Sequence, residues 1–447
     1  MDFLPQFGSF AMVIVAFVVA LSIIVAIHEY GHYIVGRWTG IHAEVFSLGF
    51  GPVLFSRVDR RGTRWQLAAL PFGGYVRFMG DADAASGKDA GAVRAMSEAD
   101  RRRTMHGAPL WARAATVAAG PVFNFVLSIV VFACLIFARG DVAEPLTVGE
   151  MRPLPGPAYA LQPGDEVLAV VGRTVPSFDD SAAMDIFSKA IPNTERLEYT
   201  IRRNGTEQVV EGPNLYPPLI SQLAPQSAAY DIGLSAGDVI TSVEGQPVAA
   251  FSDLKDHVEE AQGEPLRLTV WRPASDSEMT FVLAPRRVDE PQSGGGFATH
   301  WRIGIVGGLA FEPATQVVGP FEALGDAVSQ TGRIMTSSIS GLWHMVTGAI
   351  STCNMTGPIG IAQTSGAMAS QGAESFIWFV AALSTAVGLL NLFPVPVLDG
   401  GHLVFYAYEA VRGRPPSDGA LRVMMAAGLT LVLSLMLFAL SNDLFCP

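Results

Sequence analysis

The chain has 447 residues, enough for more than one folded unit; half of them are hydrophobic and 16% are charged. Soluble proteins of this size usually carry about 25% charged residues, so the composition favours a membrane protein over a soluble enzyme with buried helices. The formal net charge of −12 argues against nucleic acid as a partner.

Four long stretches contain no Asp, Glu, Lys or Arg: residues 3–27, 114–138, 375–398 and 423–442. Each reaches the roughly 20 residues that a helix needs to cross a bilayer core. The first stretch could instead be a cleaved signal peptide, but it has no basic residue before Arg37 and its apolar part is too long. We therefore expect four transmembrane helices, and we expect the first to be retained.

The distribution of basic residues predicts the orientation in the membrane. Arg and Lys are frequent between the first two stretches and recur between the last two, whereas neither terminus carries a basic side chain. By the positive-inside rule both of these loops are cytoplasmic, and both termini and the long central segment face outward. The expected segments are a first transmembrane helix at 1–36, a cytoplasmic loop at 37–112, a second helix at 113–139, a third at 374–411 and a fourth at 420–447.

The central segment contains an internal repeat. Seven positions recur with one constant offset: Leu161, Gly164, Asp165, Gly172, Val175, Phe178 and Asp180 match Leu234, Gly237, Asp238, Gly245, Val248, Phe251 and Asp253. The pattern predicts a strand, a glycine turn and a strand, then a helix at 180–190 and at 252–261, with further strands at 197–202 and 266–271. We expect two small domains, at 140–213 and 214–290.

The two copies resemble PDZ domains, in which Gly-Asp-x-hydrophobic precedes a strand; the second copy matches more specifically than the first. The resemblance implies tandem α+β domains that capture an extended peptide as an added strand. A spacer that binds nothing is the alternative for the first copy, and a binding or gating role is favoured for the second. The ligands of such domains are not readable from the sequence.

Two further segments carry weaker signals. Within the cytoplasmic loop, residues 45–55 and 65–78 read as strands, and a β-hairpin near the membrane must pack against protein or line a cavity to pair its backbone. Residues 291–373 read as a linker in which 321–350 form an amphipathic helix on the membrane surface.

Three cysteines are too few for a disulfide framework. Cys134 falls within the second apolar stretch, and we expect it to be an inert core residue. Cys353 and Cys446 are both expected on the outer side, and the sequence does not decide whether they pair.

A metal-binding motif follows the first apolar stretch directly, as His28-Glu29-Tyr30-Gly31-His32. Positions i and i+4 lie on one face of a helix, so both histidines can hold one ion, and Glu29 is near enough to accept a proton from water without being a ligand. Ionisable groups at the end of an apolar helix are functional by default. The alternative is that the histidines are interfacial anchors and that Glu29 reaches toward water.

A catalytic zinc ion needs a third protein ligand. Asp399 is the favoured candidate because it ends the third apolar stretch, in the tract Asn391-Leu392-Phe393-Pro394-Val395-Pro396-Val397-Leu398-Asp399-Gly400-Gly401-His402. His402 competes with it for this role. The two prolines break the helix, which frees Asn391 to contact a substrate backbone or an oxyanion.

These two elements together resemble the site-2 protease family of intramembrane metalloproteases, and the bacterial branch that regulates the sigma-E envelope stress response fits best. The shared motifs are His-Glu-x-x-His in the first helix and Asn-x-x-Pro-x-Pro-x-Leu-Asp-Gly in a later one. The resemblance covers essentially the whole chain and includes residues 120–124 and 356–360.

The resemblance implies one zinc ion per chain on His28, His32 and Asp399, with Glu29 as the catalytic base. It also implies that Asn391, Asn124 and the hairpin residues Gly73, Gly74 and Tyr75 handle substrate. The implied function is cleavage within transmembrane segments of pre-trimmed membrane proteins in the bacterial inner membrane, with the PDZ pair in the periplasm as a size filter. The implied partners are the lipid bilayer and either a single-pass anti-sigma factor or remnant signal peptides.

Two other classes of protein are the alternatives. A proteolytically silent PDZ scaffold would bind no metal and would leave Glu29 and Asp399 unexplained at membrane depth. A metal transporter would require polar residues along several helices, and the second and fourth stretches offer little beyond Asn124 and Ser128.

Overall fold

The computed structural model describes residues 3–81, 96–178, 180–292 and 296–446. The chain forms two compact units. The first comprises Met1–Leu135, Phe321–Trp343 and Thr352–Cys446, and the second comprises Ile136–Pro320 and His344–Ser351. Residues 82–95 of the expected cytoplasmic loop lie outside the described residues.

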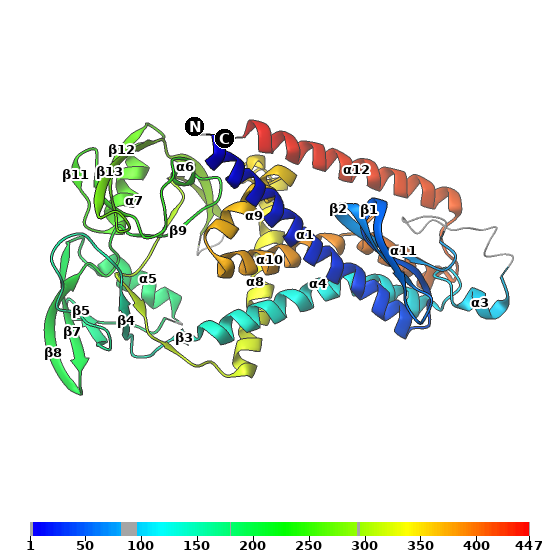
Figure 1. Ribbon diagram of the computed structural model, residues 1–447, viewed down its shortest axis with the longest axis horizontal. Helices are drawn as coiled ribbons and strands as arrows, with labels where there is room; N and C mark the ends of the chain where they lie inside the picture. The colour runs from blue at the N-terminus through cyan, green and yellow to red at the C-terminus, as the bar shows by residue number, and fades with distance from the viewer. Residues whose placement is uncertain (1–2, 82–95, 179, 293–295, 447) are drawn as a thin grey trace. The chain divides into compact units, whose positions relative to one another are not determined.

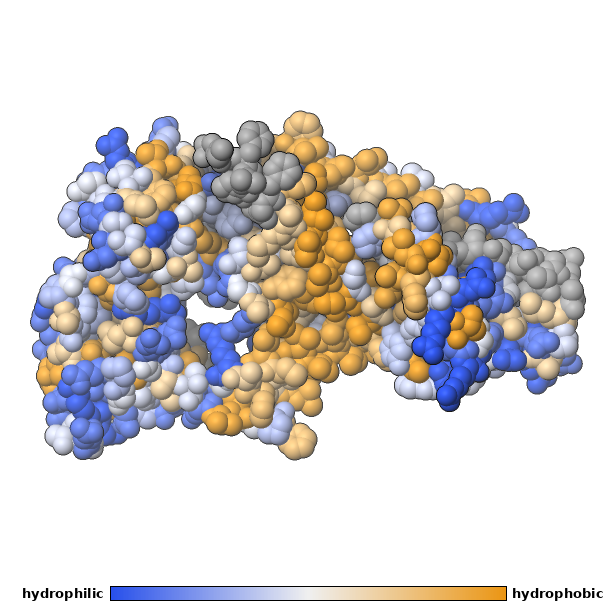
Figure 2. All heavy atoms as spheres, viewed as in Figure 1, coloured by the Kyte–Doolittle hydropathy of each residue, from blue (hydrophilic) through white to orange (hydrophobic). Residues whose placement is uncertain are grey.

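Long apolar helices build the first unit (Figure 1). Over the described residues, four helices are long and apolar enough to cross a membrane. They contain the charge-free stretches 3–27, 114–138 and 423–442 and the third stretch as far as residue 391. They are α1 (Phe3–Trp38), α4 (Leu110–Arg139), α10 (Ala373–Asn391) and α12 (Asp418–Phe445). Figure 2 shows mostly hydrophobic residues on the surface over α1, as expected for a helix whose solvent is lipid.

Further helices lie outside the two repeats. They are α3 (Glu98–Arg102), α8 (Pro320–Val346), the 3₁₀ turn η1 (Thr352–Asn354), α9 (Pro358–Ser370) and α11 (Asp399–Arg412). The amphipathic helix expected at 321–350 corresponds to α8. The helix α9, which packs against α1 and α12, was not predicted, because its Gly- and Ser-rich sequence has neither an apolar run nor a clear helical period.

The strands β1 (Ala43–Val58) and β2 (Arg64–Phe78) confirm the predicted hairpin. Both strands are long and irregular, with bends at which the pairing shifts. Residues 45–48 of β1 pair on one side with 64–67 and on the other with 74–77, while 53–58 pair with 64–68. The hairpin therefore folds into a small sheet of its own, and β2 packs along α1.

The internal repeat is confirmed by two four-stranded sheets of equivalent order in the second unit. In the first repeat the strands lie in the order β6 (Arg173–Thr174), β5 (Glu166–Val170), β7 (Arg196–Arg203) and β8 (Thr206–Pro213). Its helix is α5 (Ser181–Ala190). In the second repeat the strands lie in the order β11 (Gln246–Pro247), β10 (Val239–Val243), β12 (Leu266–Arg272) and β13 (Ser277–Leu283). Its helices are α6 (Ala228–Asp231) and α7 (Phe251–Glu260). The predicted helices and strands of both copies lie within one residue of these bounds.

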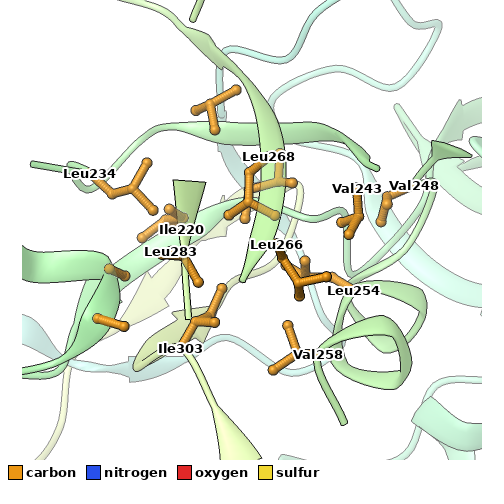
Figure 3. Packing of buried hydrophobic residues seen from close by; sticks show 14 of the residues in the cluster. Ile220, Leu234, Val243, Val248, Leu254, Val258, Leu266, Leu268, Leu283 and Ile303 are labelled. Atoms are coloured by element: carbon orange, nitrogen blue, oxygen red, sulfur yellow. The ribbon is translucent and has the colours of Figure 1, made fainter. Parts of the chain in front are cut away.

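Each repeat has its own apolar core. In the second, Leu254 and Val258 of α7 face sheet residues that include Val243, Leu266 and Leu268 (Figure 3). The repeated Asp is buried in both copies and pairs with an arginine on the neighbouring strand of the sheet: Asp165 with Arg203 on β7, and Asp238 with Arg272 on β12, each at 2.6 Å. The repeated Gly-Asp therefore fixes the start of one strand to its neighbour.

Part of the expected linker at 291–373 is instead structured. After the hairpin of β14 (Arg286–Pro291) and β15 (Phe297–Arg302), the chain returns to both repeats. The strand β16 (Ile305–Gly307) pairs with β9 (Ile220–Leu223), β17 (Phe311–Pro313) with β4 (Val148–Met151), and β18 (Thr315–Gln316) with β3 (Asp141–Val142). Strands of two or three residues separated by glycine are too short to show alternation, so the sequence did not reveal them.

Two of the three cysteines are joined. Cys353 and Cys446 form a disulfide between η1 and the end of α12. Cys134 is free and exposed, so the expectation that it is a core residue was wrong. Its side chain lies on an outer face of α4, where an apolar sequence meets lipid instead of protein.

Candidate metal centre

Three potential ligands converge within the first unit: His28 and His32 from α1, and Asp399 from the first turn of α11. The two Nε2 atoms are 3.1 Å apart. Oδ2 of Asp399 lies 3.1 Å from Nε2 of His28 and 3.5 Å from Nε2 of His32. Each side chain therefore directs one ligand atom to the same point.

This donor set fits a zinc ion. Ligand atoms about 2.0 Å from a tetrahedral metal lie roughly 3.3 Å from one another, and the three separations fall around that value. Two imidazoles and one carboxylate are a combination that catalytic zinc sites use, and three protein ligands leave a fourth position for water or substrate. The residues present are therefore suited to the ion.

The partner of His32 fixes its tautomer. Its Nδ1 lies 2.9 Å from the carbonyl oxygen of Thr116 in α4. A carbonyl only accepts, so Nδ1 carries the proton and Nε2 presents its lone pair to the cluster.

The partner of His28 is Asn124, a fully buried residue of α4. The Asn124 amide nitrogen is placed 3.1 Å from Nδ1, while its Oδ1 is buried with no hydrogen-bond partner. The oxygen and nitrogen of an amide exchange by a flip of the group. With Oδ1 toward His28, the oxygen accepts from Nδ1–H, and Nε2 keeps its lone pair for a metal.

Glycines bring the three helices close enough to form this cluster. A Cβ on Gly31 of α1 would lie 2.5 Å from the carbonyl oxygen of Ala119 in α4. A Cβ on Gly120 would collide with the imidazole of His32, and one on Gly388 of α10 would lie 3.1 Å from Cβ of Asn124. Small residues permit such approach between helices in lipid, where burial of apolar surface does not drive their association.

A sharp corner between α10 and α11 delivers Asp399. Residues 392–398, which include Pro394 and Pro396, connect the two helices, so the third apolar stretch ends as a turn. Gly400 and Gly401 lie against backbone carbonyls of this turn, where any side chain would collide. The carboxylate can therefore enter the interior at the first residue of a new helix.

The other residues singled out by the sequence are distributed around this cluster. Gly74 of β2 lies beside α1, and a Cβ there would be 3.2 Å from Cγ of Glu29. Its neighbours Gly73 and Tyr75 contact Phe50 of β1, with the two aromatic rings stacked at 5.9 Å. The hairpin thus runs directly past the Glu29 side chain.

Asn391 and His402 lie near the corner but outside the cluster. Asn391 ends α10, and its amide donates to the carbonyl of Val387 in the same helix. His402 follows Asp399 by one turn, and its ring contacts Phe405. Over the described residues, the group within ligand distance contains Asp399 and not His402.

Sequence reasoning missed Thr116 and the pair Arg113–Glu409. Arg113 at the start of α4 makes two hydrogen bonds, of 3.1 and 2.6 Å, to Glu409 of α11, with both groups largely buried. The pair ties the helix that carries Asp399 to the helix that carries Asn124. Arg113 directly precedes the second apolar stretch, but nothing in the sequence indicates that it faces Glu409.

A helical His-Glu-x-x-His, completed by a carboxylate and set among helices of membrane length, defines a membrane-embedded metallopeptidase. The model of peptidase family M50 matches residues 16–435. A protein of Agrobacterium fabrum with the name "Putative zinc metalloprotease" is 35% identical over 435 residues, covering 96% of this chain and 95% of its own. One of Brucella suis with the same description is 35% identical over 445 residues, covering 98% and 97%.

The regulator of sigma-E protease of Salmonella typhimurium is 32% identical over 459 residues, covering 96% of this chain and 97% of its own. The chain belongs to peptidase family M50. It is a zinc metalloprotease with membrane-length helices, as the motifs predicted.

Proposed function

We propose that the protein is an intramembrane zinc endopeptidase of the bacterial inner membrane, and that it cuts transmembrane segments of membrane proteins trimmed beforehand. The observation that carries this proposal is the cluster of His28, His32 and Asp399, with Glu29 beside it, on helices of membrane length. The 32% identity with a regulator of sigma-E protease supports a role in envelope stress signalling. The substrate classes are a single-pass anti-sigma factor and remnant signal peptides.

In this proposal His28, His32 and Asp399 hold one zinc ion. When bound, zinc acts as a Lewis acid and lowers the pKa of water to about 7. Glu29 lies on α1 between the two histidines and is not one of the three ligands, so its carboxylate remains available as the base. It accepts the proton of the attacking water and then donates it to the nitrogen of the leaving amine.

Substrate reaches this base along the hairpin. A transmembrane helix protects its peptide bonds because its carbonyls are bonded internally, so a stretch must first unwind. Residues 74–77 of β2 pair with β1 on one side and lie next to Glu29, which suits addition of an extended substrate strand. Gly73, Gly74 and Tyr75 would contact this substrate strand. Asn391 would bind the substrate backbone beyond the paired strand.

Asn124 has a different role in this scheme. Because it is fully buried and faces His28, it is better suited to hold the imidazole than to contact substrate. It is therefore a positioning residue.

The two repeats are proposed to be PDZ-like domains at 140–213 and 214–290, completed by the returning strands β16 and β17. Both termini and the repeats would lie in the periplasm, where the repeats would act as a size filter for substrates. The basic residues of the loop at 37–112 support this orientation. The zinc site would then lie toward the cytoplasmic side.

The decisive experiment compares the wild type with Glu29→Gln in detergent, using a model membrane-spanning peptide and measuring bound zinc. Both proteins should hold one zinc ion, and only the wild type should cleave, with cleavage abolished by a chelator. Asp399→Asn should lose the metal, whereas His402→Gln should keep it. Absence of zinc from the wild type, or equal cleavage by Glu29→Gln, would refute the proposal and favour a scaffold.

A further inference from the structure

A basic cavity of about 270 Å³ lies at the end of α1, away from the metal centre. The end of α1, the start of β1, the turn between β1 and β2 and the chain after α3 meet there. Its polar lining consists of Tyr33, Arg37, His42, Arg61, Thr63 and Arg103. Among the described residues, neither Asp nor Glu lines it.

The three guanidinium groups have no anionic partner at this cavity. Within the described ranges, none of the arginines forms an ion pair, and Arg37 donates only to the hydroxyl of Tyr33 at 3.3 Å. The carboxylate of Asp59 lies beside the lining and accepts from the hydroxyl of Tyr33 at 3.4 Å. It also accepts from the backbone N–H groups of Arg61 and Thr63 and from the indole of Trp65.

Like charges that converge without a counter-charge favour a bound anion. Guanidinium groups are planar and donate in pairs, a geometry that matches phosphate oxygens. The His42 ring adds a further hydrogen-bonding group to the lining. The cavity is slightly smaller than the roughly 300–1,000 Å³ of pockets that enclose a drug-sized ligand, so it suits a headgroup and not an acyl chain.

The surroundings point to the membrane as the source of this anion. Trp38, the neighbour of Arg37, is 71% exposed at the end of the first apolar helix, where tryptophan marks the membrane interface. Leu54 and Phe55 on β1 are 68% and 65% exposed, which suits contact with lipid. Basic pockets beside transmembrane helices on the cytoplasmic side bind anionic headgroups.

We propose that this cavity is a phosphate-binding site that takes the headgroup of an anionic phospholipid from the cytoplasmic leaflet. The site goes beyond the peptidase activity and rests on it only for the proposed orientation in the membrane. Bound there, the headgroup would join α1 to the hairpin turn through Arg37, Arg61 and Arg103. It would thereby hold β2 in place along α1, next to Glu29.

The test measures binding of phosphatidylglycerol and of phosphatidylcholine to the delipidated full chain by native mass spectrometry. The pocket variant is Arg37→Gln with Arg103→Gln. The matched control is Arg60→Gln with Arg64→Gln, which removes the same charge from exposed residues of the hairpin outside the lining. A third variant, Arg37→Lys with Arg103→Lys, retains the charge.

Wild type should bind phosphatidylglycerol more tightly than phosphatidylcholine. Each arginine near an anionic lipid raises the affinity for that lipid about fivefold. The pocket variant, which lacks two arginines, should therefore bind phosphatidylglycerol roughly 25-fold more weakly. The control should lose clearly less binding than the pocket variant because Arg60 and Arg64 lie outside the lining, and the lysine variant should retain most of the binding. If the pocket variant does not fold, the exposed Arg61→Gln replaces it, with an expected loss of about fivefold.

Equal losses in the pocket variant and the control, or no preference for phosphatidylglycerol, would overturn the proposal. A parallel arm uses millimolar inorganic phosphate without anionic lipid. The lipid assignment is refuted if inorganic phosphate binds to the wild type but not to the pocket variant, and phosphatidylglycerol binds to neither protein. The ligand is then a soluble phosphate. Unchanged zinc content in all variants shows that the metal centre is not the cause.

Discussion

At the scale of single residues, Asn124 shows how a side chain without chemistry of its own can control a metal ligand. Its amide is buried against His28, and its Oδ1 has no other hydrogen-bond partner. Partners of this kind fix the orientation and tautomer of a ligating imidazole, and their loss typically weakens metal binding 10- to 100-fold.

We therefore expect Asn124→Ala to bind zinc about 10- to 100-fold more weakly than the wild type, as measured by competition with a chromophoric chelator. Asn124→Asp should bind better than Asn124→Ala, because its carboxylate can still accept from Nδ1–H. The control is Ser128→Ala, one turn further along α4, whose hydroxyl contacts backbone carbonyls of Asn124 and Ala381 only. Equal zinc affinity in wild type and Asn124→Ala would contradict the assigned role.

At the scale of elements, the packing of α1 against α4 depends on two glycines. Gly31 faces the backbone of Ala119, and Gly120 faces the imidazoles of His32 and His28. A single added methyl group would separate the helices or displace the ligands, since neither a backbone carbonyl nor a constrained imidazole can move freely. Overpacking of this kind costs roughly 1–3 kcal/mol.

We therefore expect Gly120→Ala to lose zinc and to unfold at a lower temperature than the wild type. Its free energy of unfolding should fall by about 1–3 kcal/mol. The matched control is Gly332→Ala in α8, where no heavy atom lies within 4 Å of the added Cβ. That change should be neutral or slightly stabilising, because alanine is the better helix former. Zinc retained in full by Gly120→Ala would show that the helices are less tightly packed at this position.

At the scale of the whole chain, a disulfide and a helix cap anchor the C-terminal end of α12. Cys446 is bonded to Cys353, a sequence separation of 93 residues. The nearby carboxylate of Asp443 accepts backbone hydrogen bonds from Gly357, Ile359 and Gly360 at the start of α9. A carboxylate is favourable at a helix N-terminus because of the exposed N–H groups there. The carboxylate holds the start of α9, which packs on α1, to α12, and the disulfide holds η1 to the same helix.

Closing a loop of this length constrains the unfolded chain, and disulfides contribute about 2–4 kcal/mol on average. Cys446→Ser should therefore unfold at a lower temperature, whereas Cys134→Ser should behave as the wild type because Cys134 is unpaired. Alkylation of the native protein before reduction should label Cys134 alone. Labelling of all three cysteines would show that the chain is reduced, which would also weigh against a periplasmic location for both ends of the disulfide.

The sequence alone determined the features that depend on local spacing. The charge-free stretches predicted the long helices, the i and i+4 positions of His28 and His32 fixed a shared helical face, and alternating residues with glycine turns predicted the hairpin and both repeats. Each of these signals is carried by neighbours in the chain, so backbone geometry is sufficient to interpret it.

The tertiary structure decided which distant residues meet. It brought Asp399, and not His402, within ligand distance of the histidines. It also paired Cys353 with Cys446, buried Asn124 against His28, and returned β16 and β17 to the two repeats. These contacts join segments far apart in the chain. The metal cluster depends on helix approach at glycines and on the corner at Pro394 and Pro396. Long-range packing of this kind leaves no local pattern in the sequence.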